Sequence, residues 1–321
     1  MRIRNDELKL HIIFTIISHA RFKPKKILYG GDELEPQKRV MAIHDISCVG
    51  RCSLTVALPL LSAAGINAAV VPTAVLSTHT GGFTDFTYRD LSDDLLPIAR
   101  HWKSLGLSFD AIYSGYLAST NQIAIIAEIF DMFKTESNMI LIDPVMGDNG
   151  RLYSAYTPDM AAGMKKLCAK ADIIVPNLTE AALLLDEKYV ETGYDHKYIE
   201  RLLIKLSKTG AKAVVLTGVS YEENKIGAAG YDADNGEFFY SFCEKAPDIF
   251  HGTGDIFASV LLAALLKNFS LERAIRTAVL FTQRCVILSE ELNQEKKYGV
   301  CFEKATPYLL ELLSFPDAAE D

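Results

Sequence analysis

The sequence contains no apolar run of the length that crosses a membrane. A spanning helix needs about 18 or more consecutive apolar residues, and no window reaches that length. The six cysteines form no C-x-x-C pair and show no zinc-finger spacing with histidine. Dispersed cysteines in a chain of 321 residues indicate reduced thiols. We therefore predict a cytoplasmic protein with no membrane partner.

The sequence also lacks an excess of positive charge. Lys and Arg total 33 against 41 Asp and Glu, which gives a formal net charge of −8. An acidic surface repels the phosphate backbone, so we predict no nucleic-acid partner. A small anionic ligand is still compatible with this charge, because a few local donors outweigh the net charge at short range.

Several common catalytic motifs are absent. The chain has no G-x-x-x-x-G-K-[ST], which excludes a Walker-type nucleotide site. No G-x-G-x-x-G follows the first expected strand, which argues against an ordinary dinucleotide site. Neither G-x-S-x-G nor H-E-x-x-H occurs.

The sequence does contain a long alternation of strand and helix patterns. Apolar residues make up 49% of the chain, enough for a sizeable core. We expect strands at 40–44, 68–71, 111–113, 139–142, 173–175 and 213–216, with helices between them. A hairpin is expected around Asp234-Asn235-Gly236. This alternation predicts an α/β fold with a mostly parallel central sheet covered by helices on both faces.

The first 38 residues differ from the rest. The segment 23–33 is polar and rich in helix and strand breakers, which is typical of a linker. The apolar run 11–17 follows basic residues and mimics a weak signal peptide, but it is short and preceded by Asp6 and Glu7. We predict that residues 1–38 are a poorly ordered or dispensable extension and that 39–321 form one domain.

The sharpest chemical signal is G-T-G-D at 252–255, directly before an apolar helix. Small residues there expose consecutive backbone N–H groups, and the helix start adds partial positive charge. Such a turn suits the charge that develops on a transferring phosphoryl group. Asp255 could accept the proton of a substrate hydroxyl. The structural alternative is an ordinary first-turn carboxylate.

Two further motifs follow expected strands, where ligands of open parallel sheets bind. In P-N-L-T-E at 176–180, Asn177 and Glu180 share one side of a helix start and could orient waters around Mg²⁺. The alternative is an N-cap with a capping-box glutamate, and both readings stay open. In D-P-V-M-G-D at 143–148, Asp143 and Asp148 could position a metal–nucleotide complex, or Asp143 could cap a turn.

Together these motifs resemble the ribokinase-like superfamily and, within it, the pyridoxal (vitamin B6) kinases. S-T-H-T-G at 77–81, S-G-Y at 114–116 and the segment 43–55 add to the likeness, which covers about residues 39–316. The resemblance implies a three-layer α/β/α sandwich. It also implies ATP-dependent phosphorylation of the 5′-hydroxymethyl group of pyridoxal, pyridoxine or pyridoxamine, with Mg²⁺, often a monovalent cation, and a homodimer.

The resemblance also assigns roles to residues. Asp255 is the general base, and Gly252, Thr253 and Gly254 supply the anion hole. The other positions carried over are Asp143 and Glu180 at the metal, Asp148, Asn177, Thr217 and Gly218 at the nucleotide, and Asp45, His79, Thr80 and Tyr116 around the pyridine ring.

One departure from the family pattern leaves the acceptor open. Many pyridoxal kinases carry Ser near the position of Asp45, whereas an acid accepts hydrogen bonds from a ring hydroxyl or a protonated ring nitrogen. Related hydroxymethylpyrimidine kinases carry Asp in this loop. The alternatives are a kinase of hydroxymethylpyrimidine or of a sugar and, in a different class, a B6- or nucleotide-binding protein that has lost catalysis. His79 as a loop histidine and Tyr116 as a half-buried packing residue are the structural alternatives at those positions.

Overall fold

The computed structural model describes residues 36–248 and 250–314. From Gln37 onward the chain forms one compact unit. The extension predicted over residues 1–38 falls outside the described residues except for its last three positions, and its role stays a prediction. No helix in the described ranges is long and apolar enough to cross a membrane.

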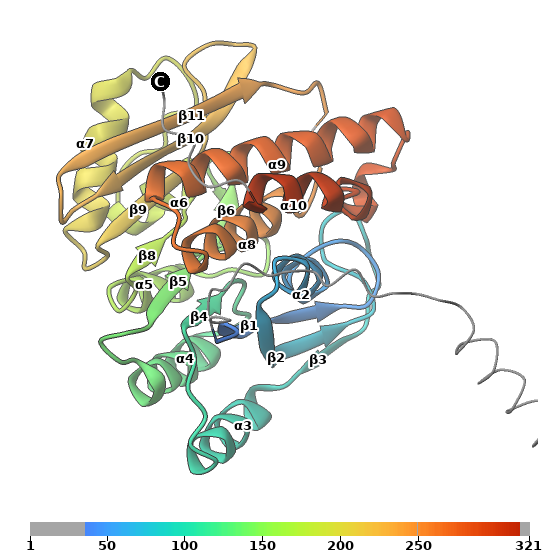
Figure 1. Ribbon diagram of the computed structural model, residues 1–321, viewed down its shortest axis with the longest axis vertical. Coiled ribbons are helices and arrows are strands. Elements are labelled where there is room, and N and C mark those ends of the chain that lie inside the picture. Colours follow the sequence, from blue (N-terminus) through green and yellow to red (C-terminus); the bar gives the residue numbers. More distant parts are fainter. Residues whose placement is uncertain (1–35, 249, 315–321) are drawn as a thin grey trace, which may run out of the picture. The chain divides into compact units, whose positions relative to one another are not determined.

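A nine-stranded sheet forms the centre of this unit (Figure 1). Its spatial order is β11-β10-β9-β8-β5-β4-β1-β2-β3, and neighbouring strands from β2 to β9 run parallel. The antiparallel pairs of this sheet are β2 with β3, β9 with β10, and β10 with β11. The strands are β1 (Arg39–Ser47), β2 (Asn67–Leu76), β3 (Tyr88–Asp90), β4 (Ala111–Ser114), β5 (Met139–Ile142), β8 (Ile173–Ile174), β9 (Ala213–Val219), β10 (Lys225–Asp232) and β11 (Glu237–Glu244). The mostly parallel sheet expected from the sequence is confirmed.

Helices cover both faces of the sheet (Figure 1). One layer contains α2 (Leu54–Ala63), α8 (Thr253–Leu266), α9 (Leu271–Glu291) and α10 (Thr306–Ser314). The other contains α3 (Ser92–Ser104), α4 (Thr120–Phe133), α5 (Pro158–Cys168), α6 (Leu178–Leu185) and α7 (His196–Ser207). The three-layer sandwich is therefore also confirmed.

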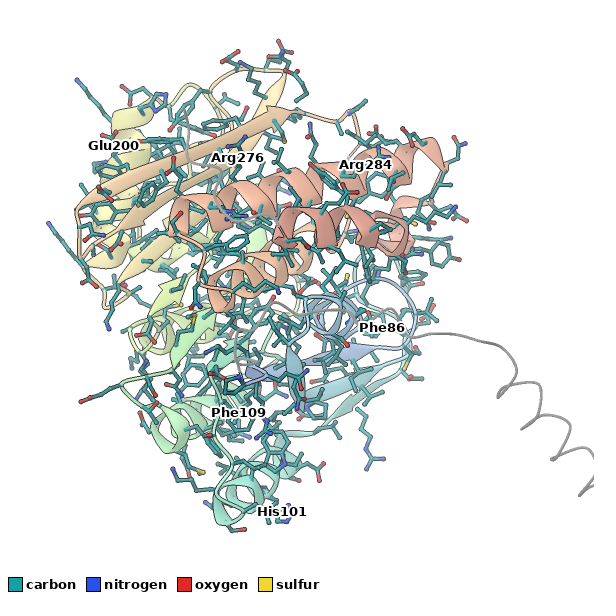
Figure 2. The ribbon with its side chains drawn as sticks, viewed as in Figure 1. Phe86, His101, Phe109, Glu200, Arg276 and Arg284 are labelled. Atoms are coloured by element: carbon teal, nitrogen blue, oxygen red, sulfur yellow. The ribbon has the colours of Figure 1, made fainter. Side chains whose placement is uncertain are left out.

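Each central strand supplies side chains to both hydrophobic cores, because successive residues of a strand point to opposite faces. In β4, Tyr113 packs in the core beneath α8 while Ile112 packs in the core beneath α4. The single tryptophan, Trp102, packs against Phe109 (labelled in Figure 2) at a ring-centroid distance of 5.6 Å. Burial on both faces explains why the strands have continuous apolar sequences.

Two small features were absent from the sequence prediction. β3 is an edge strand of three residues, all exposed, so it carries no apolar pattern. The ribbon of β6 (Gly147–Asp148) and β7 (Arg151–Leu152) has two residues per strand and lies outside the main sheet. Backbone pairing rather than hydrophobic patterning defines both features.

The fold predicts a strong difference between two leucines. Leu261, in α8, is fully buried, whereas Leu310, in α10, is 45% exposed. We expect Leu261→Ala to lower the free energy of unfolding by about 2–5 kcal/mol. Leu310→Ala should change it by less than about 0.5 kcal/mol. Urea denaturation of the two variants would check this, and equal losses would contradict the core assignment.

Candidate active site

The N-terminus of α8 is fixed by the glycine that precedes it. Gly252 is the N-cap residue, with φ +83°, a conformation that side chains other than glycine rarely adopt. A Cβ atom at this position would lie 2.0 Å from the carbonyl oxygen of Arg51. The first turn of a helix has N–H groups without intrahelical partners, and here they belong to Thr253, Gly254 and Asp255. The helix mouth is thus a turn with N–H groups available to an anion, and it lies directly against the loop after β1.

Asp255 lies in this first turn and is held by the same loop. Its Oδ2 atom accepts a hydrogen bond of 2.9 Å from the backbone N–H of Ser53. The pKa of Asp255 is raised to about 7, mainly by burial; the Ser53 N–H opposes this shift, and the charge of Asp45 adds to it. A carboxylate with a pKa near neutrality is suited to accept and release a proton.

Asp45 lies near the end of β1 and is connected to Asp255 through Ser53. The Ser53 hydroxyl donates to Oδ1 of Asp45 at 2.6 Å, and the Ser47 hydroxyl is 3.1 Å from Oδ2. Burial raises the pKa of Asp45, and both hydroxyls oppose this shift. Burial also raises the pKa of Tyr116, with the charge of Asp45 as the second cause. The structure thus brings Asp45, Tyr116 and Asp255 into one region.

Asp143 and Glu180 add two buried carboxyl groups. Asp143 follows β5, and its Oδ2 atom would lie 3.6 Å from a Cβ atom placed on Gly254, next to the mouth of α8. Burial raises the pKa of Asp143, and the charges of Glu180 and Asp255 raise it further. Burial also raises the pKa of Glu180, to about 8, against the opposing effect of backbone hydrogen bonds.

Glu180 forms the capping box that was one of the two sequence readings. Asn177 accepts from the N–H of Glu180 at 2.9 Å, and Glu180 Oε2 accepts from the N–H of Asn177 at 2.8 Å. Glu180 Oε1 accepts from the N–H of Met146 at 3.0 Å. The capping role predicted for this motif is therefore present. Glu180 accepts hydrogen bonds from backbone N–H groups, whereas the buried carboxyl group of Asp143 has no donor among the described residues.

The described residues contain no cluster of three or more metal-ligating side chains. A Mg²⁺ ion on a nucleotide keeps several waters and needs only one or two protein carboxylates. Buried, mutually repelling acids beside an anion-binding turn are compatible with such an ion. The chemistry of Asp143 and Glu180 therefore fits the metal that the resemblance implies.

The residues predicted at the nucleotide lie after β8 (Asn177), within β9 (Thr217 and Gly218) and within β6 (Asp148). Asn177 and Thr217 form a parallel bridge, with the N–H of Thr217 donating to Pro176. Gly218 is exposed and has φ +71°. Asp148 is exposed and accepts hydrogen bonds from Asn149. Asn177 also donates to the carbonyl of Gly147 at 2.9 Å, so its side chain connects α6 to the small ribbon.

His79 has its polar atoms engaged within the chain. Its Nε2 atom lies 2.6 Å from the carbonyl oxygen of Lys297, and its Nδ1 atom accepts from the N–H of Gly81 at 3.1 Å. Burial lowers the pKa of His79, which favours the neutral ring that these two bonds require. The neighbouring Thr80 is exposed. These contacts match the loop-histidine alternative and leave no ring nitrogen of His79 free for a ligand.

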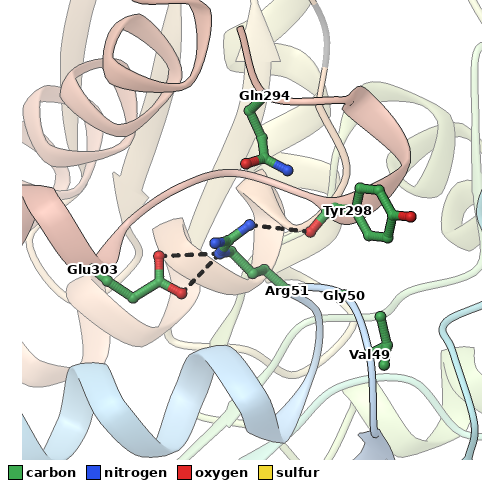
Figure 3. Close-up of a pocket in the computed structure, with 6 residues that line it drawn as sticks. All are labelled: Val49, Gly50, Arg51, Gln294, Tyr298 and Glu303. Carbon is green, nitrogen blue, oxygen red and sulfur yellow. Dashed lines mark hydrogen bonds and ion pairs between the residues drawn. The ribbon is translucent and has the colours of Figure 1, made fainter. Parts of the chain in front are cut away.

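Two residues of the loop after β1 were given no role from the sequence. Ser53 joins Asp45 to Asp255, as described above. The guanidinium of Arg51 donates to both carboxylate oxygens of Glu303 at 2.8 and 3.0 Å and to the carbonyl of Tyr298 at 3.5 Å (Figure 3). The backbone N–H of Arg51 donates to the same carbonyl at 3.1 Å. A pocket of about 340 Å³ adjoins Arg51; it is lined by Val49, Gly50, Arg51, Gln294, Tyr298 and Glu303 (Figure 3). The contact between Arg51 and Glu303 joins residues 252 positions apart, and no short sequence motif indicates a contact over that separation.

The fold and the site define the class of the protein. A three-layer α/β/α unit with a G-T-G-D turn at the mouth of a buried helix is the arrangement of the ribokinase-like superfamily. The family model described as phosphomethylpyrimidine kinase matches residues 58–301. The chain belongs to this family, and it is a phosphotransferase that acts on an alcohol group.

Individual relatives support this assignment. The structure of a Bacteroides thetaiotaomicron protein, assigned as a phosphomethylpyrimidine kinase and crystallised with pyridoxal, is 36% identical with a TM-score of 0.82 and covers 85% of this chain and 96% of its own. Pyridoxal kinase of Lactobacillus plantarum is 31% identical with a TM-score of 0.79, covering 86% and 98%. Pyridoxine kinase of Bacillus subtilis is 30% identical over 190 residues, 59% of this chain and 68% of its own.

The packing of Gly252 generates a direct test. Ala at position 252 would press its Cβ atom against the Arg51 carbonyl and displace the helix mouth. We expect Gly252→Ala to lower kcat by about 10²–10³, the usual cost of losing a donor to developing charge. Steady-state kinetics would measure the loss.

A matched glycine separates this effect from backbone strain. Gly236, in the β10–β11 turn, has φ +73° but no atom within 4 Å of an added Cβ. Gly236→Ala should cost stability of about 1–2 kcal/mol and leave kcat unchanged. Equal effects of both variants on kcat would show that the Arg51 contact is unimportant.

Proposed function

We propose that the protein transfers the γ-phosphoryl group of ATP to the 5′-hydroxymethyl group of a B6 vitamer: pyridoxal, pyridoxine or pyridoxamine. The observation that carries this proposal is the placement of Asp255 in the anion-binding turn of α8, linked through Ser53 to Asp45. One end of the site can hold a phosphoryl group and a hydroxyl, and the other offers an acid to a polar aromatic ring.

In this proposal Asp255 orients the hydroxyl of the acceptor and takes its proton. The hydroxyl oxygen forms a bond to the γ-phosphorus while the bond to ADP breaks, and the N–H groups of Thr253 and Gly254 meet the oxygens that gain charge. Most of the catalytic work in phosphoryl transfer is such positioning and charge stabilisation. Asp143 and Glu180 would hold Mg²⁺, directly or through water, which when bound offsets the phosphate charge.

The placement of the nucleotide rests on the neighbouring strand ends. Asn177, Thr217 and Gly218 lie side by side after β8 and in β9, and Gly218 leaves open space beside its backbone. The exposed carboxylate of Asp148 completes the proposed nucleotide positions. Asp45 and Tyr116 are the proposed contacts to the ring of the acceptor. We place the exposed Thr80 at the edge of this site, and the hydrogen bonds of His79 stabilise the loop that carries Thr80.

Hydroxymethylpyrimidine is the second candidate acceptor. The name of the matching family and the acid at position 45 favour it. The Bacteroides relative bound to pyridoxal and the Lactobacillus pyridoxal kinase favour a B6 vitamer. A binding protein without catalysis would have no need of the acid Asp255 beside the Gly252 turn. A homodimer, a cytoplasmic location and a monovalent cation stay predictions from the family resemblance.

An acceptor panel tests the proposed function. ADP release would be measured with ATP and Mg²⁺ in the presence of pyridoxal, pyridoxine, pyridoxamine or hydroxymethylpyrimidine. We expect the highest kcat/KM with one of the three vitamers, because relatives of 31–36% identity include a protein crystallised with pyridoxal and a pyridoxal kinase. A clear preference for hydroxymethylpyrimidine would replace the proposed substrate, and the lack of turnover with every acceptor would refute the kinase.

The base assignment predicts a loss of rate and a pH dependence. Asp255→Asn should lower kcat by about 10²–10⁴, the range of general-base catalysis. In the wild type, kcat/KM should fall as the pH drops below about 7, because burial raises the pKa of Asp255 to that value and the protonated acid cannot accept a proton. Kinetics between pH 5.5 and 8.5, with circular dichroism to verify folding, would measure both. Ordinary turnover in a folded Asp255→Asn variant would remove Asp255 as the base.

A further inference from the structure

Ser53 occupies a backbone conformation that disfavours a serine. Its φ is +56° and its ψ is −129°, close to the first central position of a type II′ turn, where glycine predominates. A residue with a side chain in such a region costs about 1–3 kcal/mol relative to a relaxed backbone. Glycine would avoid this cost, so the presence of a side chain calls for a physical reason.

The hydroxyl of Ser53 does not perform the usual work of an N-cap serine. Ser53 precedes α2, yet its side chain makes no capping hydrogen bond to that helix. The serines that precede α4 and α9 behave differently: Ser119 accepts from the N–H of Gln122, and Ser270 accepts from the N–H of Arg273. In Ser53 the hydroxyl instead donates to Asp45 at 2.6 Å, in a buried position.

All three polar groups of Ser53 are engaged by different parts of the molecule. The carbonyl accepts from Val56 and Ala57 at the start of α2, the N–H donates to Asp255, and the hydroxyl donates to Asp45. A hydrogen bond to a charged group is worth more than one between neutral groups. The hydroxyl therefore fixes the orientation of Asp45 relative to Asp255.

We propose that Ser53 is a positioning residue whose hydroxyl sets the Asp45 carboxylate for recognition of the acceptor ring, while its backbone N–H aligns Asp255 with the hydroxyl to be phosphorylated. This inference rests on the proposed function and adds to it a residue outside the G-T-G-D turn. It also explains why a strained serine stands where glycine would be more stable.

Two substitutions separate the hydroxyl from the strain. Ser53→Gly removes the hydroxyl and relieves the backbone, whereas Ser53→Ala removes the hydroxyl and keeps the Cβ atom. We expect both variants to raise the KM for the acceptor about tenfold or more and to leave the KM for ATP unchanged. The melting temperature of Ser53→Gly should exceed that of Ser53→Ala. If Ser53 only supported the fold, the more stable variant Ser53→Gly would bind the acceptor as well as the wild type does.

A double-mutant cycle tests whether Ser53 acts through Asp45. In an Asp45→Ala background, Ser53→Gly should have no further effect on the KM for the acceptor. Ser270→Ala is the matched control, because it removes a serine that does cap its helix; it should lower the melting temperature and leave both KM values unchanged. Wild-type acceptor KM in Ser53→Gly, or additive effects in the cycle, would overturn the proposal.

Binding measurements keep this test separate from the test of the proposed function. The dissociation constant of pyridoxal would be measured by absorbance titration for the wild type and both Ser53 variants, without turnover. If the wild type binds pyridoxal but phosphorylates no vitamer, the proposed function fails, while weaker binding by both Ser53 variants still supports the role of Ser53. If the wild type turns over a vitamer and the Ser53 variants bind it equally well, only the inference about Ser53 fails.

Discussion

The contact between Gly252 and the carbonyl of Arg51 sets the geometry of the site. It joins the mouth of α8 to the loop after β1, at a distance that leaves no room for a Cβ atom. Arg51 is held in turn by Tyr298 and Glu303, close to the C-terminal helix. Because Ser53 follows Arg51 by two residues, this anchoring also determines where the N–H that binds Asp255 can lie.

The site concentrates buried acids, and this arrangement costs stability. Burial raises the pKa of Asp45, Asp143, Glu180 and Asp255. An acid whose pKa is higher in the folded than in the unfolded chain contributes stability below its unfolded pKa of about 4, and this contribution is lost as the pH rises through the folded value. For Asp255 and Glu180 that loss extends to about pH 7 and about pH 8. Functional sites commonly retain such unfavourable groups because the chemistry requires them.

Much of the fold and the centre of the site could be predicted from the sequence, because they depend on local patterns. Apolar segments bounded by glycine, proline and polar residues predict the strands of the parallel sheet. The G-T-G turn before an apolar run predicts the start of α8 at Thr253. β3 escaped prediction because three exposed residues carry no hydrophobic pattern. The hydrogen bond from His79 to the carbonyl of Lys297 joins positions 218 apart, and no side-chain type in the sequence indicates a backbone acceptor.

Ser53 illustrates a different limit. A serine directly before an apolar helix is expected to cap that helix, so the sequence alone suggests no other role for Ser53. Only the dihedral angles and the direction of its hydroxyl reveal that it serves Asp45 instead. The sequence cannot distinguish the two roles because both need the same small hydroxyl at the same position.

The motif of Asn177 and Glu180 shows how a structural and a catalytic role can coincide. Each carboxylate oxygen of Glu180 accepts one hydrogen bond: Oε2 from the N–H of Asn177, within the capping box, and Oε1 from the N–H of Met146, outside it. A carboxylate oxygen has further acceptor capacity, so these bonds fix the position of the Glu180 carboxyl group and still leave lone pairs for a ligand. When it is ionised, Glu180 lies close enough to raise the pKa of Asp143. In the proposed reaction a cation between protein and phosphate would offset the charge of both acids, and the capping box keeps Glu180 in place for it.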